Sequence, residues 1–249
     1  MCDALPLTGE RTVPGIPEEN YWFRRHEVAY LAITARYTGK DVLEAGSGEG
    51  YGAAMLAAAG ARVTALDYDE QAVAHVRAAY PAVTMLHGNL AQLPVPDGAV
   101  DAVVNFQVIE HLWDQSQFLA EVARVLRPGG ELAISTPNRL TFSPGRDTPL
   151  NPFHTRELDS AELAELLAGV GLEVTDRRGV FHGARLAELD ARHGGSFIDA
   201  QIERSLAGEP WPAELSRDVA GVAAADFDIR ADAADSLDLL FFARKAESA

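Results

Sequence analysis

The sequence predicts an α/β fold in which helices cover both faces of a mostly parallel β-sheet. Short segments rich in apolar and β-branched residues alternate with amphipathic helical patterns, as in consecutive β-α-β units. A glycine-rich turn at 46–50 joins the first of these strands to the first of these helices. Because α/β domains of roughly 200–250 residues are common, the 249 residues predict a single domain, 1–249.

Seven strands are expected, each bounded by Gly, Pro or acidic residues. In chain order they cover 41–45, 61–67, 82–87, 99–106, 130–136, 172–181 and 236–244. Helical patterns cover 51–59, 70–80, 117–126 and a stretch near 197–207. Pro128-Gly129-Gly130 predicts a turn after the third of these helices. Asp159, with Glu162 three residues later, has the pattern of a capping box, which predicts a further helix ended by Gly169 and Gly171.

Three segments interrupt this alternation. The N-terminal segment 1–38 contains a helix, 138–156 is proline-rich and aperiodic, and 182–235 separates the last two strands. Long aperiodic loops in a compact domain are usually functional, and open α/β sheets bind ligands at the carboxyl ends of their strands. We therefore expect 138–156 to lie over that edge as a substrate-binding loop and 182–235 to form a lid.

Composition limits the partners and the compartment. With 21 basic and 37 acidic residues, the net charge of −16 repels phosphate backbones and anionic lipids, so a neutral or cationic partner fits better than nucleic acid. No apolar stretch approaches the ~20 residues of a membrane span, so no membrane insertion is expected. Met1-Cys2-Asp3 does not resemble the start of a secretory signal, which favours the cytoplasm, and Cys2 has no partner for an internal disulfide.

The glycine-rich turn predicts a nucleotide-type cofactor site. Glu44 precedes Gly46-Ser47-Gly48-Glu49-Gly50 between a strand and a helix. A dinucleotide-binding turn would need glycine at position 51, which is Tyr51, so the spacing is G-x-G-x-G and favours S-adenosylmethionine. Glycines let the backbone approach the ligand, the helix N-terminus favours its carboxylate, and Glu44 can face its ammonium group. The alternative is that these glycines only form a tight turn.

Acidic and amide side chains follow the next strands. Asp67 ends the second strand and can accept both ribose hydroxyl protons, although it could instead cap the following helix, for which Asp69 is better placed. Asn89 and the backbone N–H of Leu90 can contact the adenine edge, although asparagine there is also typical of a turn. The remaining residues assigned to the cofactor site are Tyr68 and Gln107.

Four ordered motifs within 41–136 resemble class I S-adenosylmethionine-dependent methyltransferases. Besides the acidic end of strand two, they are EAGSGEG, GNLAQLPVPDGAVDAVV, FQVIEHL and VLRPGGELAISTPN. Three flanking segments resemble mycobacterial methyltransferases associated with 6-O-methylglucose lipopolysaccharide assembly: TGERTVPGIPEENYWFRRHEVAY, TPNRLTFSPGRDTPLNPFHTREL and ARHGGSFIDAQI. The resemblance implies a Rossmann-like sheet of order 3-2-1-4-5-7-6 with an antiparallel last strand. It also implies an acceptor hydroxyl on a glucose-based oligosaccharide, a call that composition and spacing do not make.

A sugar hydroxyl calls for a general base or a metal ion, because it is a poor nucleophile near neutral pH. Imidazole titrates near neutrality, and we rank His154 before His111, with Glu110 beside it, because His154 lies in the loop expected to reach over the methyl group. Alternatively, Glu110 and His111 begin a helix in a polar niche, and His154 only anchors its loop or binds a sugar. In related quinone methyltransferases an acidic residue at the position of Gln107 helps to hold a divalent ion. The glutamine argues against metal ligands here but leaves Mg²⁺ open.

Polar and aromatic residues in the three interrupting segments are assigned to the acceptor: Tyr21, Trp22, Arg25, Arg146, Asp147, Asp190 and His193. Trp22 and Arg25 could stack on a sugar or close over the cofactor. The alternatives are ordinary helix packing for the first three and surface positions on a lid for the last two. A quinone or another small metabolite remains the alternative acceptor. A cofactor-binding sensor or a dinucleotide-dependent oxidoreductase remains open on fold grounds, although the glycine spacing disfavours the oxidoreductase.

Overall fold

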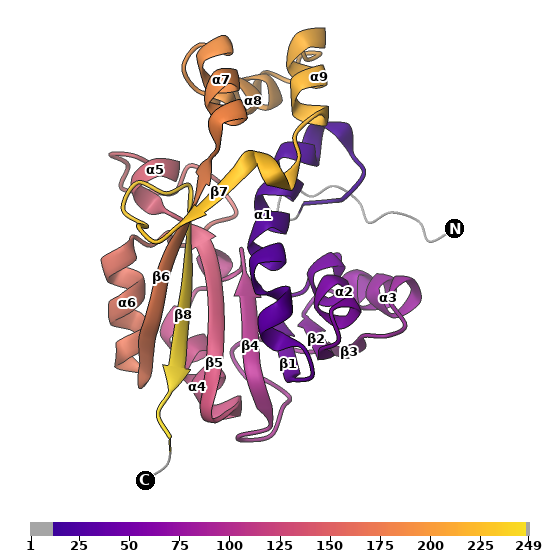
Figure 1. The fold of residues 1–249 in the computed structure, drawn as a ribbon, viewed down its shortest axis with the longest axis vertical. Helices are drawn as coiled ribbons and strands as arrows, with labels where there is room; N and C mark the ends of the chain where they lie inside the picture. Colours follow the sequence, from indigo (N-terminus) through magenta and orange to yellow (C-terminus); the bar gives the residue numbers. More distant parts are fainter. Residues whose placement is uncertain (1–11, 248–249) are drawn as a thin grey trace.

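The computed structural model describes residues 12–247 and contains one mixed β-sheet with helices on both faces (Figure 1). The predictions for Met1-Cys2-Asp3 lie outside the described residues. The strands are β1 (Asp41–Ala45), β2 (Arg62–Asp67), β3 (Thr84–His87), β4 (Val100–Phe106), β5 (Leu126–Pro137), β6 (Leu172–His182), β7 (Phe227–Arg230) and β8 (Asp238–Lys245). The α-helices are α1 (Asn20–Ile33), α2 (Tyr51–Ala58), α3 (Glu70–Ala79), α4 (Gln115–Val125), α5 (Arg139–Phe142), α6 (Ser160–Gly169), α7 (Ala184–Arg192), α8 (Phe197–Ala207) and α9 (Ala213–Ala220).

The strand order is β3-β2-β1-β4-β5-β8-β6-β7, which corrects the predicted seven-stranded order 3-2-1-4-5-7-6. The strands expected sixth and seventh in the chain are β6 and β8, and β8 runs antiparallel to both β5 and β6. The additional strand β7 lies inside the segment 182–235 and pairs with the outer side of β6. It was missed because it has only four residues, in which Phe227 and Ile229 alone carry an apolar alternation.

Two local predictions also need correction. The turn expected at Pro128-Gly129-Gly130 lies inside β5, because the backbone becomes extended at Leu126, directly after α4, and pairs there with Val100. The glycines instead accompany a register shift in the β4–β5 pairing. The loop 138–156 is not wholly irregular, since Asn138 caps the short helix α5. The capping box of Asp159 and Glu162 is present as predicted.

Each face of the sheet has its own apolar core. On one face, α4 and α6 contribute Phe118, Leu119, Val122, Leu163 and Leu167. On the other face, α1, α2 and α3 contribute Tyr30, Ile33, Leu56, Val73 and Val76. Among the described residues, no helix combines the length and apolar character needed to cross a bilayer.

The segment 182–235 folds over the carboxyl ends of the parallel strands, where Figure 1 shows α7, α8 and α9 above the sheet. We call this segment the lid. It has a third apolar core, which includes Leu186, Phe197 and Val219 together with Tyr21 from α1. The amino-terminal half of α1 is therefore part of the lid's packing, whereas its carboxyl-terminal half packs against the sheet.

A buried ion pair fixes α1 to the sheet. The guanidinium of Arg25 donates from Nε and Nη2 to the two carboxylate oxygens of Asp238, at 2.7 and 2.6 Å, and from Nη2 to the carbonyl of Leu237. The two side chains are only 2% and 1% exposed. Asp238 begins β8, next to Pro137 of β5 and Val180 of β6. Breaking such a pair leaves a buried charge without compensation.

We predict that Asp238→Ala lowers the free energy of unfolding by about 3–5 kcal/mol, because Arg25 is left buried and unpaired. Asp228→Ala is the matched control, since its pair with Arg230 is about half exposed on both sides and should contribute less than about 1 kcal/mol. Urea denaturation measures both changes, and equal losses in the two variants would contradict the assignment.

Candidate functional site

The glycine turn after β1 is built for close approach of a ligand. Gly46, Gly48 and Gly50 all have positive φ angles. A side chain at Gly46 would collide with Val108, 2.7 Å away, whereas the space beside the α-carbon of Gly48 is open within 4 Å. The turn is thus closed on the side that faces Val108 in the loop after β4. It is open at Gly48, where a cofactor can reach the backbone.

Asp67 supports this turn. Its carboxylate accepts from the backbone N–H of Gly48 at 2.8 Å and from that of Asp69 at 3.0 Å. Asp69, rather than Asp67, caps α3 by accepting from Gln71. Asp67 is therefore free of the capping role that was its alternative, and it lies beside the exposed Tyr68.

Glu44 lies beneath the turn and is 1% exposed. Its Oε1 accepts a hydrogen bond from the hydroxyl of Tyr30 at 2.7 Å, and its Oε2 has no hydrogen-bond partner among the described residues. Burial raises the pKa of this carboxyl to about 8. A buried acid with one unsatisfied oxygen is suited to a cationic ligand group.

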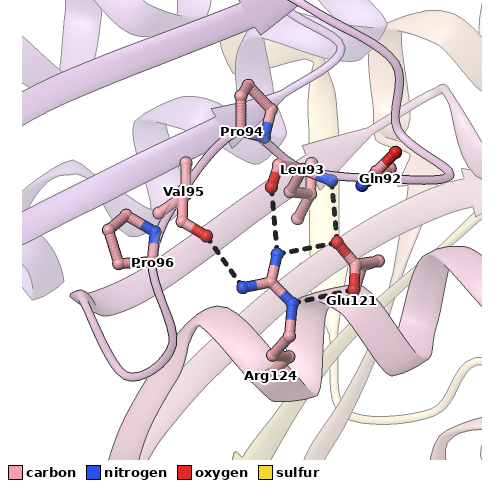
Figure 2. A pocket seen from close by; sticks show the side chains of 7 residues that line it. All are labelled: Gln92, Leu93, Pro94, Val95, Pro96, Glu121 and Arg124. Carbon is pink, nitrogen blue, oxygen red and sulfur yellow. Dashed lines mark hydrogen bonds and ion pairs between the residues drawn. The ribbon is translucent and has the colours of Figure 1, made fainter.

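The loop after β3 is held in place by α4. Asn89 accepts from the backbone N–H of Ala91, as in an ordinary turn, and Leu90 is buried. Further along, Figure 2 shows the guanidinium of Arg124 donating to the carbonyls of Leu93 and Val95. The cavity of about 420 Å³ in that figure is lined by this loop and α4, and none of the predicted cofactor residues lines it. We therefore interpret it as part of the loop's support.

Gln107 follows β4 in a left-handed conformation, with φ of +57°, and no other non-glycine residue in the described part of the chain has a positive φ. Its backbone N–H donates to the carbonyl of Ser135 at 2.8 Å. Such conformations are strained and are concentrated at functional sites. The strain lies where the chain turns from β4 toward Glu110 and His111.

Glu110, His111 and His154 come together in one cluster. The rings of His111 and His154 lie 4.9 Å apart, and Glu110 accepts from the hydroxyl of Thr136 at 2.9 Å. Burial raises the pKa of Glu110 to about 7, although the nearby His154 acts in the opposite direction. The sequence analysis treated His111 and His154 as alternative candidates for the general base, whereas in the fold their side chains are neighbours.

His154 forms a dyad with Glu157, which the sequence analysis missed. Its Nδ1 lies 2.7 Å from Oε1 of Glu157, and its Nε2 lies 3.1 Å from the amide nitrogen of Asn151. Because that amide nitrogen can only donate, Nε2 accepts and the ring proton lies on Nδ1, facing the carboxylate. The imidazole is 5% exposed and does not point freely into a cleft as expected. The sequence signal that could have identified this pair is the i, i+3 spacing of His154 and Glu157.

The cluster could also hold a cation. One donor atom each from Glu110, His111 and His154 lies within 4.8 Å of the others. Nδ1 of His111 lies 3.0 Å from the carbonyl of Phe153, and Nδ1 of His154 faces Glu157, which are the outer contacts typical of metal-binding imidazoles. Two imidazoles suit a transition metal better than Mg²⁺, which prefers oxygen ligands.

The side chains of α1 that were assigned to the acceptor lie in different parts of the structure. Arg25 stacks near Trp22 and Phe142, with its guanidinium carbon 5.5 and 5.9 Å from the two ring centroids. Tyr21 is fully buried in the lid core, where its hydroxyl donates to His182 at 2.6 Å, and its contact with an acceptor stays a prediction that would need this core to open. His26, one residue after Arg25 in the helix, was missed, and burial lowers its pKa to about 4.

Asp190 and His193 make hydrogen bonds within the lid, and their assignment to the acceptor stays a prediction. Asp190 accepts from Nδ1 of His182 at 2.7 Å and from the backbone N–H of Phe197. His193 pairs with Asp218 on α9 at 2.9 Å. In the loop 138–156, Arg146 lines a cavity of about 370 Å³ beneath α8, whereas the exposed Asp147 does not.

Comparisons with known proteins agree with this arrangement. Residues 43–134 match the family described as Methyltransferase domain. The chain is 66% identical over 247 residues to a probable S-adenosylmethionine-dependent methyltransferase of Mycolicibacterium smegmatis, covering 98% of this chain and 96% of the relative. It is 60% identical over 244 residues to one of Mycobacterium tuberculosis, covering 96% and 89%. A methyltransferase from Thermotoga maritima, described as a possible histamine N-methyltransferase, shares the fold at 16% identity, with a TM-score of 0.63 and coverage of 92% and 96%.

The sheet order and the glycine turn at its carboxyl edge define an α/β enzyme with a nucleotide-type cofactor site. The chain belongs to the S-adenosylmethionine-dependent methyltransferases, and S-adenosylmethionine is its cofactor. The glycine spacing and the acidic end of β2 fit this cofactor, and the oxidoreductase alternative is wrong.

The burial of Glu44 predicts a pH-dependent stability. Since its folded pKa of about 8 exceeds the ordinary carboxyl value, its contribution to stability is complete at low pH and is lost as the pH rises toward 8. Glu44→Gln removes this loss, so the variant should gain about 3–4 kcal/mol relative to wild type between about pH 5 and about pH 8. Urea denaturation of the cofactor-free protein measures the gain. Glu188 is exposed on α7, so the stability of Glu188→Gln should depend on pH in the same way as that of wild type. If the stability of Glu44→Gln also followed the wild-type pH dependence, the burial argument would be contradicted.

Proposed function

We propose that this enzyme methylates a hydroxyl group on a glucose-based oligosaccharide or polysaccharide precursor of the 6-O-methylglucose lipopolysaccharide type. The observation that carries the proposal is the cluster of the buried Glu110 with the partly buried His111 and His154, extended by Glu157. A hydroxyl must lose its proton as it attacks, so its methylation calls for a base at the site. Its position supports the proposal, because a side chain added at Gly46 in the cofactor turn would meet Val108, which is two residues before Glu110.

When bound, S-adenosylmethionine supplies an electrophilic methyl group on a sulfonium that leaves as a thioether. In the proposal, Asp67 accepts the ribose hydroxyl protons and Glu44 faces the ammonium group. Asn89 and the backbone of Leu90 face the adenine edge. The open side of Gly48 supports this placement, as does the unsatisfied Oε2 of Glu44.

His154 acts as the base in this proposal. Its Nε2 has the lone pair that can accept the hydroxyl proton once the amide of Asn151 moves away. The carboxylate of Glu157 then stabilises the imidazolium through the proton on Nδ1, as in other histidine–carboxylate pairs. Glu157 is a positioning residue, and His111 is the second candidate for the base.

The acceptor is tested by incubating the enzyme with labelled S-adenosylmethionine and a panel of glucose oligosaccharides, hydroxylated benzoquinones with their reduced quinols, and proteins. We expect the label to appear in the oligosaccharides as a methyl ether, which alkali does not hydrolyse. Label confined to the quinones would favour the alternative, a methyltransferase of quinones or other small metabolites, and would overturn the glycan assignment.

For the base, we predict that His154→Ala lowers kcat by roughly 10²–10⁴-fold without changing the affinity for the cofactor. Glu157→Gln keeps the hydrogen bond but removes the negative charge, so kcat should fall less and KM should stay the same. Thr148→Ala, exposed in the same loop, is the control. If His154→Ala raises only the KM of the acceptor, His111 becomes the better candidate.

Chelation separates the base from a metal. Enzyme treated with EDTA should keep its activity if His154 is the base. Loss of activity that Mn²⁺ or Zn²⁺ restores would instead assign Glu110, His111 and His154 to a metal centre.

A further inference from the structure

The cavity of about 370 Å³ lies between the loop 138–156 and α8 of the lid, with Arg25 in its wall. Its volume is within the range of ligand pockets, roughly 300–1,000 Å³. It adjoins the proposed base, because Phe142 lines it and the Phe142 ring lies 5.5 Å from the ring of His154. A molecule in the cavity would therefore be one aromatic side chain away from His154.

Arg25, in the wall of the cavity, has one buried guanidinium nitrogen without a hydrogen-bond partner among the described residues. Nε and Nη2 are bound to Asp238 and Leu237, but Nη1 is buried and has no hydrogen-bond partner among the described residues. A buried donor in this state costs free energy that a ligand oxygen would recover. Because Asp238 already neutralises the guanidinium, an uncharged oxygen fits Nη1 better than an anion does.

The rest of the lining combines polar and apolar groups. Asp199 and Glu203 lie one turn apart on α8 and can accept hydrogen bonds from hydroxyls, while Arg146 on the opposite loop can donate. Ile198 and Ile202, also on α8, add apolar surface. Hydroxyl donors, hydroxyl acceptors and an apolar face occur together in a sugar ring.

We propose that this cavity is a subsite for one uncharged, polyhydroxylated unit of the acceptor, which is a sugar residue. Its hydroxyls bind Asp199 and Glu203, its oxygens accept from Arg25 and Arg146, and its apolar face contacts Phe142 and the isoleucines. The inference rests on the proposed function, because it names the part of the acceptor that is held while a neighbouring hydroxyl reaches His154.

The test uses maltotriose as an uncharged sugar, and a water-soluble benzoquinone as an apolar probe. Each is titrated by calorimetry into the full-length enzyme saturated with S-adenosylhomocysteine. We expect maltotriose to bind, and the double variant Asp199→Asn/Glu203→Gln to bind it at least tenfold more weakly. Arg204→Gln, exposed on α8 and outside the cavity lining, should bind it as wild type does. Unchanged affinity for S-adenosylhomocysteine shows that each variant is folded.

Failure to bind maltotriose, equal affinity in the double variant, or tighter binding of the benzoquinone that the double variant leaves unchanged would each overturn the subsite. Methyl transfer is measured separately. If sugars are methylated but their KM is the same in the double variant, the proposed function stands and the subsite is wrong. If maltotriose binds as expected but no sugar is methylated, the subsite stands and the proposed function is wrong.

Discussion

The buried ion pair between Arg25 and Asp238 is the constraint on which the site depends. Two charges that are almost wholly removed from water persist only in well-defined geometry, so the pair fixes where α1 crosses the carboxyl edge of the sheet. Asp238 stands at the start of β8, between β5 and β6, and Arg25 reaches Phe142 of the loop 138–156. One interaction thus sets the relative positions of the sheet, the first helix and the loop that carries His154.

The same helix connects the cofactor turn with the lid. Near its carboxyl end, Tyr30 donates to Glu44 beneath the glycine turn. Near its amino end, Tyr21 donates to His182, which in turn donates to Asp190 in the lid. Burial lowers the pKa of His182, so the ring remains neutral and can accept from the tyrosine. A segment that precedes the sheet in the sequence therefore contacts both the cofactor strand and the lid.

Local patterns predicted most of the fold, and long-range pairing limited the rest. Strands such as 41–45 and the capping box of Asp159 could be recognised because periodicity and capping involve residues a few positions apart. The glycine turn identified the cofactor class for the same reason. The burial of Tyr21, the pairing of Arg25 with Asp238 and the role of Asp190 depend on which remote segment covers a side chain, and no local pattern carries that information. The short strand β7 was not predicted because four residues contain too little alternation of apolar and polar side chains.

The distribution of charge explains how so acidic a chain can build a site for a cationic cofactor. At the periphery, arginine partners lower the pKa of Asp41 and Glu121, and the backbone N–H of Asp41, followed by Arg127, lowers that of Asp101. At the carboxyl edge, Glu44 and Glu110 have no arginine partner among the described residues, and burial raises their pKa to about 8 and about 7. Near neutral pH these two groups exchange protons readily, and perturbed groups of this kind are typical of functional sites. Carboxyl groups with arginine partners thus lie away from the cofactor turn, whereas Glu44 and Glu110 are buried acids whose charge state can respond near neutral pH.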